Sequence, residues 1–258
     1  MTDTDRPSVG LFVTCVVDLF RPNVGFAAVK LLREANCQVE VPLLQTCCGQ
    51  PAYNSGDRKD CRDIARLVIQ EFEKYDYVVV PSGSCASMMA RHYGSLFQDD
   101  EIWVERAQSF AKKVHELMSF LFDVRKVEKI DGTYEGTITY HDSCSGLREL
   151  GIKNQPRELL RSLRGLKLSE MKECEACCGF GGTFSVKYPE ISDAIVGRKT
   201  ANIAETDAEL LVAGDLGCLI NMVGKLSREG RKISGRHAAE ILAGLTSEPP
   251  IGTPQKKY

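Results

Sequence analysis

The chain has 258 residues, of which 43% are hydrophobic and 26% are charged, and its formal net charge is −2. This composition is typical of an ordinary globular protein with a substantial core, and it argues against nucleic acid as the main partner. Because no apolar run approaches the roughly 20 residues of a membrane helix and the N-terminus is unlike a signal peptide, we expect a cytoplasmic protein with no membrane span.

The first half of the chain alternates apolar, strand-like runs with helical patterns. The runs that predict strands are Val9 to Thr14, Val39 to Leu44 and Tyr77 to Val80. Apolar residues at helical spacing predict two helices between them: Val24, Ala27, Ala28, Leu31 and Ala35 for the first, and Ile64, Leu67, Val68 and Phe72 for the second. Each predicted strand leads to cysteine, first Cys15, then the pair Cys47-Cys48, then Cys85.

A long amphipathic segment separates the two halves. Its apolar residues between Ala107 and Leu121 share one face, which predicts a single bridging helix. The stretch Lys129 to Gly136 is polar and contains glycine, so we place a boundary there. We therefore expect a first cysteine-rich half at residues 1–130, including the bridging helix, and a second at residues 131–258.

The second half repeats the order of the first. Strands are predicted at Thr137 to Tyr140, around Leu166 to Leu168, and at Leu210 to Ala213, and they lead to Cys144, Cys177-Cys178 and Cys218. Helices are predicted to begin near Asn154 and at Pro189, since proline is tolerated in the first helical turn. A C-terminal helix is predicted from Ser234 to near Gly244, followed by a loose tail from Ser247 onward.

This alternation predicts an α/β fold of two pseudo-repeated β-α-β-α-β halves. Such an order gives parallel sheets with right-handed crossovers. Ligands of open parallel sheets bind beyond the carboxyl ends of the strands. Because the cysteines follow the strands, we expect them at that edge of the sheet in each half.

Eight of the eleven cysteines form two matching sets in the pattern C…CCG…C. The gaps are 32 and 37 residues in the first set and 33 and 40 in the second. Thiolates are the soft ligands of iron–sulfur clusters, usually four per cluster. So many cysteines in a chain of this size are more typical of metal binding than of a secreted disulfide scaffold. We therefore predict that two sets bind a metal cofactor, each gathered within a few ångströms: Cys15, Cys47, Cys48 and Cys85, and Cys144, Cys177, Cys178 and Cys218.

The residues around these two cysteine sets indicate their roles less clearly. Gly49 and Gly179 follow the cysteine pairs and can take the left-handed conformation that a sharp turn needs. The remaining cysteines are Cys37 and Cys61, which we interpret as small buried hydrophobic residues, and Cys174, whose role is open. His141 could be a ligand, a proton donor or a packed ring, and among these we favour a position next to the metal ligands or facing the substrate. His92, His115 and His237 are interpreted as structural.

Four stretches of sequence carry a family resemblance: TCCGQPAYNSGDR (46–58), VVVPSGSCASM (78–88), YHDSCSGLRELGI (140–152) and CCGFGGTFSVKYPEIS (177–192). They resemble the cysteine-rich CCG-domain family, which includes the cysteine-rich subunit of heterodisulfide reductase and the glycolate oxidase iron–sulfur subunit, and most of all its lactate-utilisation branch. The resemblance covers nearly the whole chain. It implies an iron–sulfur subunit, with [4Fe–4S] clusters, for oxidation of L-lactate to pyruvate, and companion proteins that include a ferredoxin-like iron–sulfur subunit.

The sequence departs from the heterodisulfide reductase relatives at the end of each motif. Those relatives end in C-x-x-C, whereas this chain has Met88 and Asn221 in place of the last cysteine. The number and type of clusters, one or two per chain, therefore stay open. No flavin or nicotinamide fingerprint is found, so we expect a non-catalytic or co-catalytic subunit of an oxidoreductase, with no catalytic residue assigned.

Three alternatives remain open from the sequence. The chain could serve oxidation of another 2-hydroxy acid, such as glycolate. It could hold structural zinc, which needs four closed ligands and does no redox chemistry. It could also be a thiol–disulfide protein that uses the adjacent cysteine pairs, which would require a thiolate of low pKa.

Overall fold

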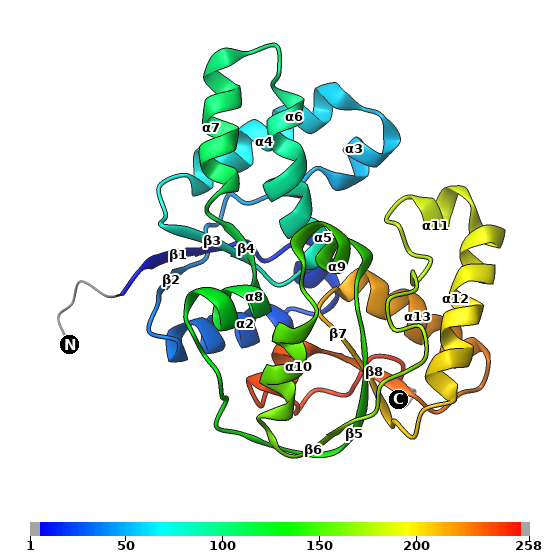
Figure 1. Ribbon diagram of the computed structural model, residues 1–258. Coiled ribbons are helices and arrows are strands. Elements are labelled where there is room, and N and C mark those ends of the chain that lie inside the picture. The colour runs from blue at the N-terminus through cyan, green and yellow to red at the C-terminus, as the bar shows by residue number, and fades with distance from the viewer. Residues whose placement is uncertain (1–5, 254–258) are drawn as a thin grey trace, which may run out of the picture.

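The computed structural model describes residues 6–253, which fold into two four-stranded parallel sheets, one from each half of the chain (Figure 1). The strand orders are β2-β1-β3-β4 and β6-β5-β7-β8, so the second sheet repeats the topology of the first. All six strand pairings are parallel. The predicted α/β class with two pseudo-repeated halves is confirmed, whereas the division of the chain at residue 130 stays a prediction.

The elements of the first half run from the first strand to a π-helical turn. They are β1 (Ser8–Leu11), α1 (Cys15–Phe20), α2 (Asn23–Glu34), β2 (Gln38–Glu40), α3 (Gln50–Ser55), α4 (Arg58–Phe72), β3 (Tyr77–Val80), α5 (Gly83–Ser87), the π-helical turn η2 (Met88–His92), α6 (Tyr93–Leu96), α7 (Glu101–Ala111), β4 (Val114–Glu116), α8 (Leu117–Ser119) and the π-helical turn η3 (Phe120–Val124).

The elements of the second half follow the same order with fewer insertions. They are β5 (Thr133–His141), α9 (Cys144–Leu150), α10 (Asn154–Arg161), β6 (Arg164–Leu168), α11 (Phe184–Lys187), α12 (Pro189–Ala204), β7 (Leu210–Ala213), α13 (Leu216–Arg228), β8 (Ser234–His237) and α14 (Ala238–Leu242). Strands β3 and β7 have the predicted bounds. Strand β5 begins at Thr133, inside the stretch that was predicted to be a polar boundary.

Each half contains a fourth strand that the predicted order lacks. The expected bridging helix at 107–121 is wrong, because it is interrupted by β4, which pairs with β3. The expected start of the C-terminal helix is also wrong, because Ser234–His237 is strand β8 beside β7, and α14 begins only at Ala238. Both strands fill an edge position next to a buried strand, and pairing with that strand outweighs the helical spacing of the apolar residues.

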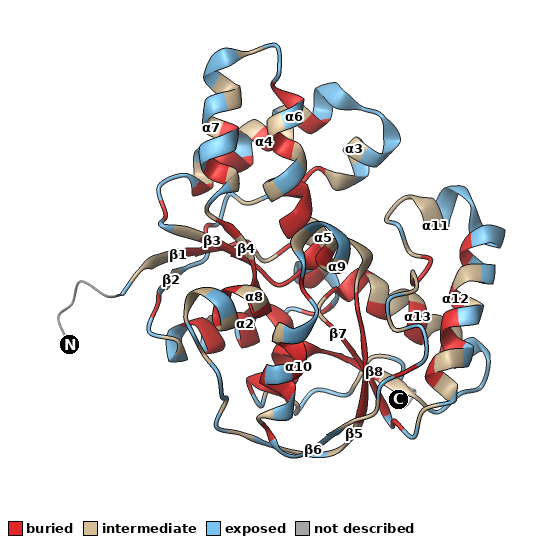
Figure 2. Cartoon of the chain, in the orientation of Figure 1, coloured by how far each residue is buried: buried red, intermediate tan, exposed pale blue. Residues whose placement is uncertain are grey.

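The two halves pack as a pseudo-symmetric pair with a shared core. Helix α5 packs against α9 and α1 against α13, while α14 packs on α2 and α8 on α10. One continuous apolar cluster contains residues from both sheets, among them Leu11, Val79, Ile138 and Leu211. A second cluster lies between the other face of the first sheet and helices α4, α6 and α7, whose outer surfaces are exposed (Figure 2).

The expected loose tail from Ser247 is partly wrong, and its last five residues, 254–258, lie outside the described residues. Ile251 pairs with Gly235 in an antiparallel bridge, and Arg21 donates a hydrogen bond of 2.8 Å to the Pro249 carbonyl. Residues 247–251 are therefore held against the sheet. Within residues 6–253, none of the helices combines the length and apolarity that crossing a membrane requires.

Candidate metal centre

The four cysteines of the first set meet at the carboxyl edge of the first sheet. Cys15 opens α1 just after β1, Cys47 and Cys48 follow β2, and Cys85 lies in the first turn of α5 after β3. The Sγ atoms of Cys48 and Cys85 are 3.3 Å apart. Cys47 is in hydrogen-bond contact with both Cys15 and Cys48, so the four thiols form one continuous chain of contacts.

The second set has the same arrangement. Cys144 opens α9 after β5, the pair Cys177-Cys178 follows β6, and Cys218 lies in the first turn of α13 after β7. Cys177 is in hydrogen-bond contact with Cys144 and Cys178, and Cys178 with Cys218. The predicted clustering of the cysteines is therefore found in both halves.

Left-handed glycines shape the turn after each cysteine pair. Gly49 has φ +82° and Gly179 has φ +78°, a region that side chains other than glycine rarely adopt. Each glycine N–H is directed at the first sulfur of its pair, at 3.4 Å from Cys47 Sγ and 3.3 Å from Cys177 Sγ. A Cβ at Gly179 would lie 2.7 Å from the Ser192 carbonyl oxygen, so helix α12 closes directly over this turn.

The thiols of each set compete for protons. Hydrogen bonds from Cys15 and Cys48 lower the pKa of Cys47, and the same contacts raise the pKa of both donors. In the second set, hydrogen bonds from Cys144 and Cys178 lower the pKa of Cys177 in the same way. One sulfur in each set is thus favoured as a thiolate, the form that binds metal. A soft metal cation would replace the shared protons in such a group of sulfurs.

The backbone carbonyl of each of the two buried cysteines accepts a hydrogen bond from a side chain. Tyr93 donates a hydrogen bond of 2.9 Å to the Cys48 carbonyl, and Asn221 donates one of 2.8 Å to the Cys178 carbonyl. Through this hydrogen bond Asn221 holds the loop of the second cysteine pair. Met88, at the equivalent place in the first half, is buried.

A carboxylate ties the two centres together across the interface. Asp215, just before α13, accepts hydrogen bonds from the Ser84 backbone N–H at 2.8 Å and from the hydroxyls of Ser84 and Ser82. Cys85 follows Ser84 directly, and Cys218 lies three residues after Asp215. Sequence analysis missed this contact, because an Asp before a helix indicates only an N-cap and its partners are more than 130 residues away.

Two cavities open onto the cysteines, one for each set. A cavity of about 240 Å³ touches all four cysteines of the first set. A cavity of about 280 Å³ touches Cys144, Cys177 and Cys218. Ser84, Phe180 and Asp215 line both cavities, so the same small group of side chains stands between the two centres.

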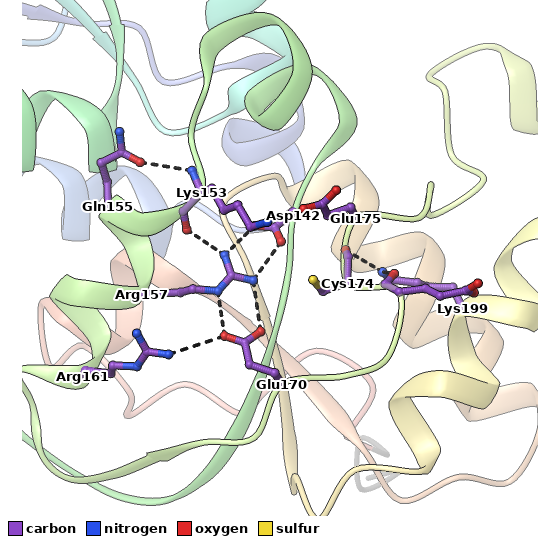
Figure 3. A network of polar contacts seen from close by, with 10 residues as sticks. Asp142, Lys153, Gln155, Arg157, Arg161, Glu170, Cys174, Glu175 and Lys199 are labelled. Carbon is purple, nitrogen blue, oxygen red and sulfur yellow. Dashed lines mark hydrogen bonds and ion pairs between the residues drawn. The ribbon is translucent and has the colours of Figure 1, made fainter.

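A polar network fixes the loop of the second set (Figure 3). Arg157 is almost fully buried and donates two hydrogen bonds to Asp142, at 2.7 and 2.8 Å, and two more to Glu170. Lys199, also buried, donates to the carbonyls of Glu173 and Cys174 at 2.8 and 2.7 Å. The segment 170–174 before the cysteine pair is therefore held by both side chains. The sequence alone could not predict these contacts, because the partners of each pair lie 13 or more residues apart along the chain.

The cysteines outside the two sets and the four histidines lie in different surroundings. Cys37 and Cys61 are fully buried in apolar clusters, in agreement with the sequence interpretation. Cys174 is partly exposed beside Asp142 (Figure 3). His92 pairs with Glu149, His115 packs on Tyr77 and Phe120, and His237 caps helix α14, so these three have structural contacts. His141 lies beside Cys178 and Cys218.

The donor set fits a cluster of soft metal ions. Each centre offers four sulfur atoms from three loops, turned toward one another at the edge of a rigid sheet. Burial of Cys48 and Cys178 and the glycine N–H groups directed at Cys47 and Cys177 supply the exclusion of water and the hydrogen bonds that tune such centres.

Known proteins share this sequence pattern over most of the chain. The cysteine-rich domain family (CCG) matches residues 9–90 and 138–223. Lactate utilization protein A of Bacillus licheniformis is 47% identical over 91% of this chain and 98% of its own length. The protein of that name from Geobacillus sp. (strain WCH70) is 46% identical over the same shares. A solved structure of a hypothetical protein from Helicobacter pylori has the same fold, with a TM-score of 0.61 and 12% identity, over 94% of this chain and 49% of that one.

Proposed function

This chain belongs to the cysteine-rich CCG-domain family, and we propose that it is an iron–sulfur electron-transfer subunit of an L-lactate oxidation system. The relatives named lactate utilization protein A match it over 91% of its length, which supports lactate as the substrate of the system. The observation that carries the proposal is the meeting of four thiols, from three separate loops, in each of the two halves.

In this proposal the eight cysteines are the ligands, with one [4Fe–4S] centre in each half. Cys15, Cys47, Cys48 and Cys85 hold the first, and Cys144, Cys177, Cys178 and Cys218 hold the second. Bound clusters would accept and release one electron at a time, which divides the two-electron oxidation of a hydroxy acid into single transfers. The protein's own part is to exclude water, fix the sulfurs and donate hydrogen bonds to them.

Further parts of the proposal concern partners and location. Companion proteins would oxidise the lactate and exchange electrons with this chain, and a ferredoxin-like iron–sulfur subunit is the partner that suits such a centre. Eleven free cysteines indicate a reducing compartment, so we place the protein in the cytoplasm.

The proposal predicts that L-lactate reduces the centres only through the companion proteins. The anaerobically purified chain is mixed with L-lactate, and its visible absorbance is followed with and without the companion subunits. Bleaching with the companions, and none with the chain alone, is expected. Bleaching by glycolate instead of lactate would assign the chain to another hydroxy acid, and bleaching by neither would contradict the proposed role.

Serine substitutions test the ligands one by one. Cys47→Ser and Cys177→Ser are each expected to remove the iron of one half, and Cys61→Ser, at a buried cysteine outside both sets, to keep all of it. Zinc bound in place of iron would indicate a structural site. A protein that binds no metal but forms a reversible disulfide would indicate a thiol–disulfide role.

A further inference from the structure

His141 is a buried histidine whose polar atoms have no partner. It is the last residue of β5 and is fully buried. Neither Nδ1 nor Nε2 has a hydrogen-bond partner among the described residues. Burying an unpaired imidazole costs free energy, and nearly all buried polar atoms in folded proteins are paired. The missing partner is therefore expected to be a group that the protein binds.

The ring faces the sulfurs of the second set. A ring nitrogen of His141 and the Sγ atoms of Cys178 and Cys218 all lie within 4.8 Å of one another. A metal ion bound by either sulfur would therefore lie next to the ring, and imidazole together with thiolate is a known ligand combination for iron. No other group of three His, Cys, Asp or Glu ligand atoms meets this condition in residues 6–253.

The first half has no counterpart to this histidine. In the second sheet, His141 pairs with Ala213, the last residue of β7. In the first sheet, the last pair between β1 and β3 is Leu11 with Val79, so Phe12 lies opposite Val80, the last residue of β3. Phe12 precedes Cys15 by as many residues as His141 precedes Cys144. Phe12 is fully buried and packs against Phe72. The equivalent position is thus apolar in one half and a potential ligand in the other.

The neighbours of His141 hold its backbone in place. Asp142 is fixed by two hydrogen bonds from the buried Arg157, and Glu170 binds the same guanidinium from the loop that leads to the cysteine pair (Figure 3). The first half has Val13 at the place of Asp142. The second half therefore carries a histidine and also the polar support that orients the strand end on which it lies.

We propose that a ring nitrogen of His141 is the fourth ligand of the metal centre in the second half, in place of one of the two neighbouring sulfurs, Cys178 or Cys218. The two centres of the chain then differ in their ligands, all sulfur in the first half and mixed nitrogen and sulfur in the second. A neutral imidazole brings no negative charge, so it raises the reduction potential relative to an all-thiolate centre. The inference rests on the proposed function, because it requires a metal centre in the second half.

The test is pulsed electron paramagnetic resonance on the full chain, purified without oxygen from cells that were supplied with 15N-histidine. A strong hyperfine coupling to histidine nitrogen is expected in the native protein. It is expected to vanish in His141→Phe, which copies the first half, and in His141→Cys, which supplies a thiolate. The control His115→Phe, at a ring packed on Tyr77 and Phe120, should keep it. In His141→Cys the reduction potential of the second centre should also shift downward.

The outcomes separate this inference from the proposed function. Full iron and sulfide content without histidine coupling would overturn the role of His141 and leave the electron-transfer role intact. Coupling that persists in both His141 variants would overturn it as well, because another histidine would then be the ligand. Native protein that binds no iron would overturn both.

Discussion

Gly49 and Gly179 have nearly the same conformation but different surroundings. Both have positive φ and direct an N–H at a cysteine sulfur. A Cβ at Gly49 would make ordinary contacts of 3.4 Å with side chains of α4, whereas one at Gly179 would lie 2.7 Å from a backbone oxygen of α12. The turn of the second set is therefore the less tolerant of the two.

We predict that alanine is tolerated better at Gly49 than at Gly179. Left-handed φ costs an alanine roughly 1–2 kcal/mol at either position. Gly179→Ala also pushes against the Ser192 carbonyl, so it should lose more unfolding free energy and should lose the iron of the second half. Urea unfolding and iron analysis of both variants check this, with Gly151→Ala as the control, since Gly151 has φ +71° and open space around it. Equal losses at Gly49 and Gly179 would show that the contact with α12 is unimportant.

The buried ion pair of the second half supplies a further prediction. Arg157 and Asp142 have side chains that are 6% and 1% exposed. Arg157→Met leaves Asp142 buried without its partner, and such a loss costs about 3–5 kcal/mol. Arg161→Met, at a side chain that is half exposed, should change the unfolding free energy by less than about 1 kcal/mol. Similar unfolding free energies for the two variants would contradict the importance of this pair.

At the scale of elements, the sequence predicts the bounds of the apolar strands β3 and β7 but misses the short, polar strands β4 and β8. β3 and β7 are runs of four apolar residues, all buried except the half-buried Tyr77, so their length and residue types both favour a buried strand. β4 and β8 read Val-His-Glu and Ser-Gly-Arg-His, which are too short and too polar to predict a strand. Each strand ends in a buried side chain that caps the next helix, Glu116 for α8 and His237 for α14.

Glu116 makes stability depend on pH. Burial raises its pKa from 4.5 to about 7, although it accepts hydrogen bonds from the Met118 and Ser119 amides. Between these pH values the folded chain holds a proton that the unfolded chain releases, so the unfolding free energy falls as pH rises. At 1.36 kcal/mol per unit, the loss is about 3 kcal/mol and is complete above pH 7.

Glu116→Gln tests this directly, because the amide oxygen can still cap α8 but does not titrate. Unfolding free energies of both proteins are measured from pH 5 to pH 8. The difference between native protein and variant should change by about 2.5 kcal/mol over this range, in favour of the variant at high pH. A constant difference would show that Glu116 titrates normally in the folded chain.

At the scale of the molecule, the two sheets depend on a common core. One apolar cluster includes residues of β1, β3, β5 and β7, and Arg21 of the first half pairs with the fully buried Glu240 of the second. The cysteine spacing predicted the repeat and the two gathered sets, because each cysteine follows a strand of a parallel sheet. It could not predict how the halves face each other, since contacts such as Asp215 with Ser84 join residues from opposite halves that have no local signal.

We predict that both halves unfold in one transition. Trp103, the one tryptophan, reports on the first half through its fluorescence. Hydrogen exchange of β7 reports on the second. Because the shared core is broken when either half opens, the two probes should give the same midpoint in urea. Two separate midpoints would mean that the halves are independent domains.

The iron and acid-labile sulfide content of the chain, purified without oxygen, tests the central claim most directly. One [4Fe–4S] centre in each half predicts about eight irons and about eight sulfides per chain, with a broad absorbance in the visible region. About four of each would mean that one of the two sets is empty. A colourless protein that contains only zinc, or one that takes up no iron on anaerobic reconstitution, would contradict the claim that this chain carries electrons.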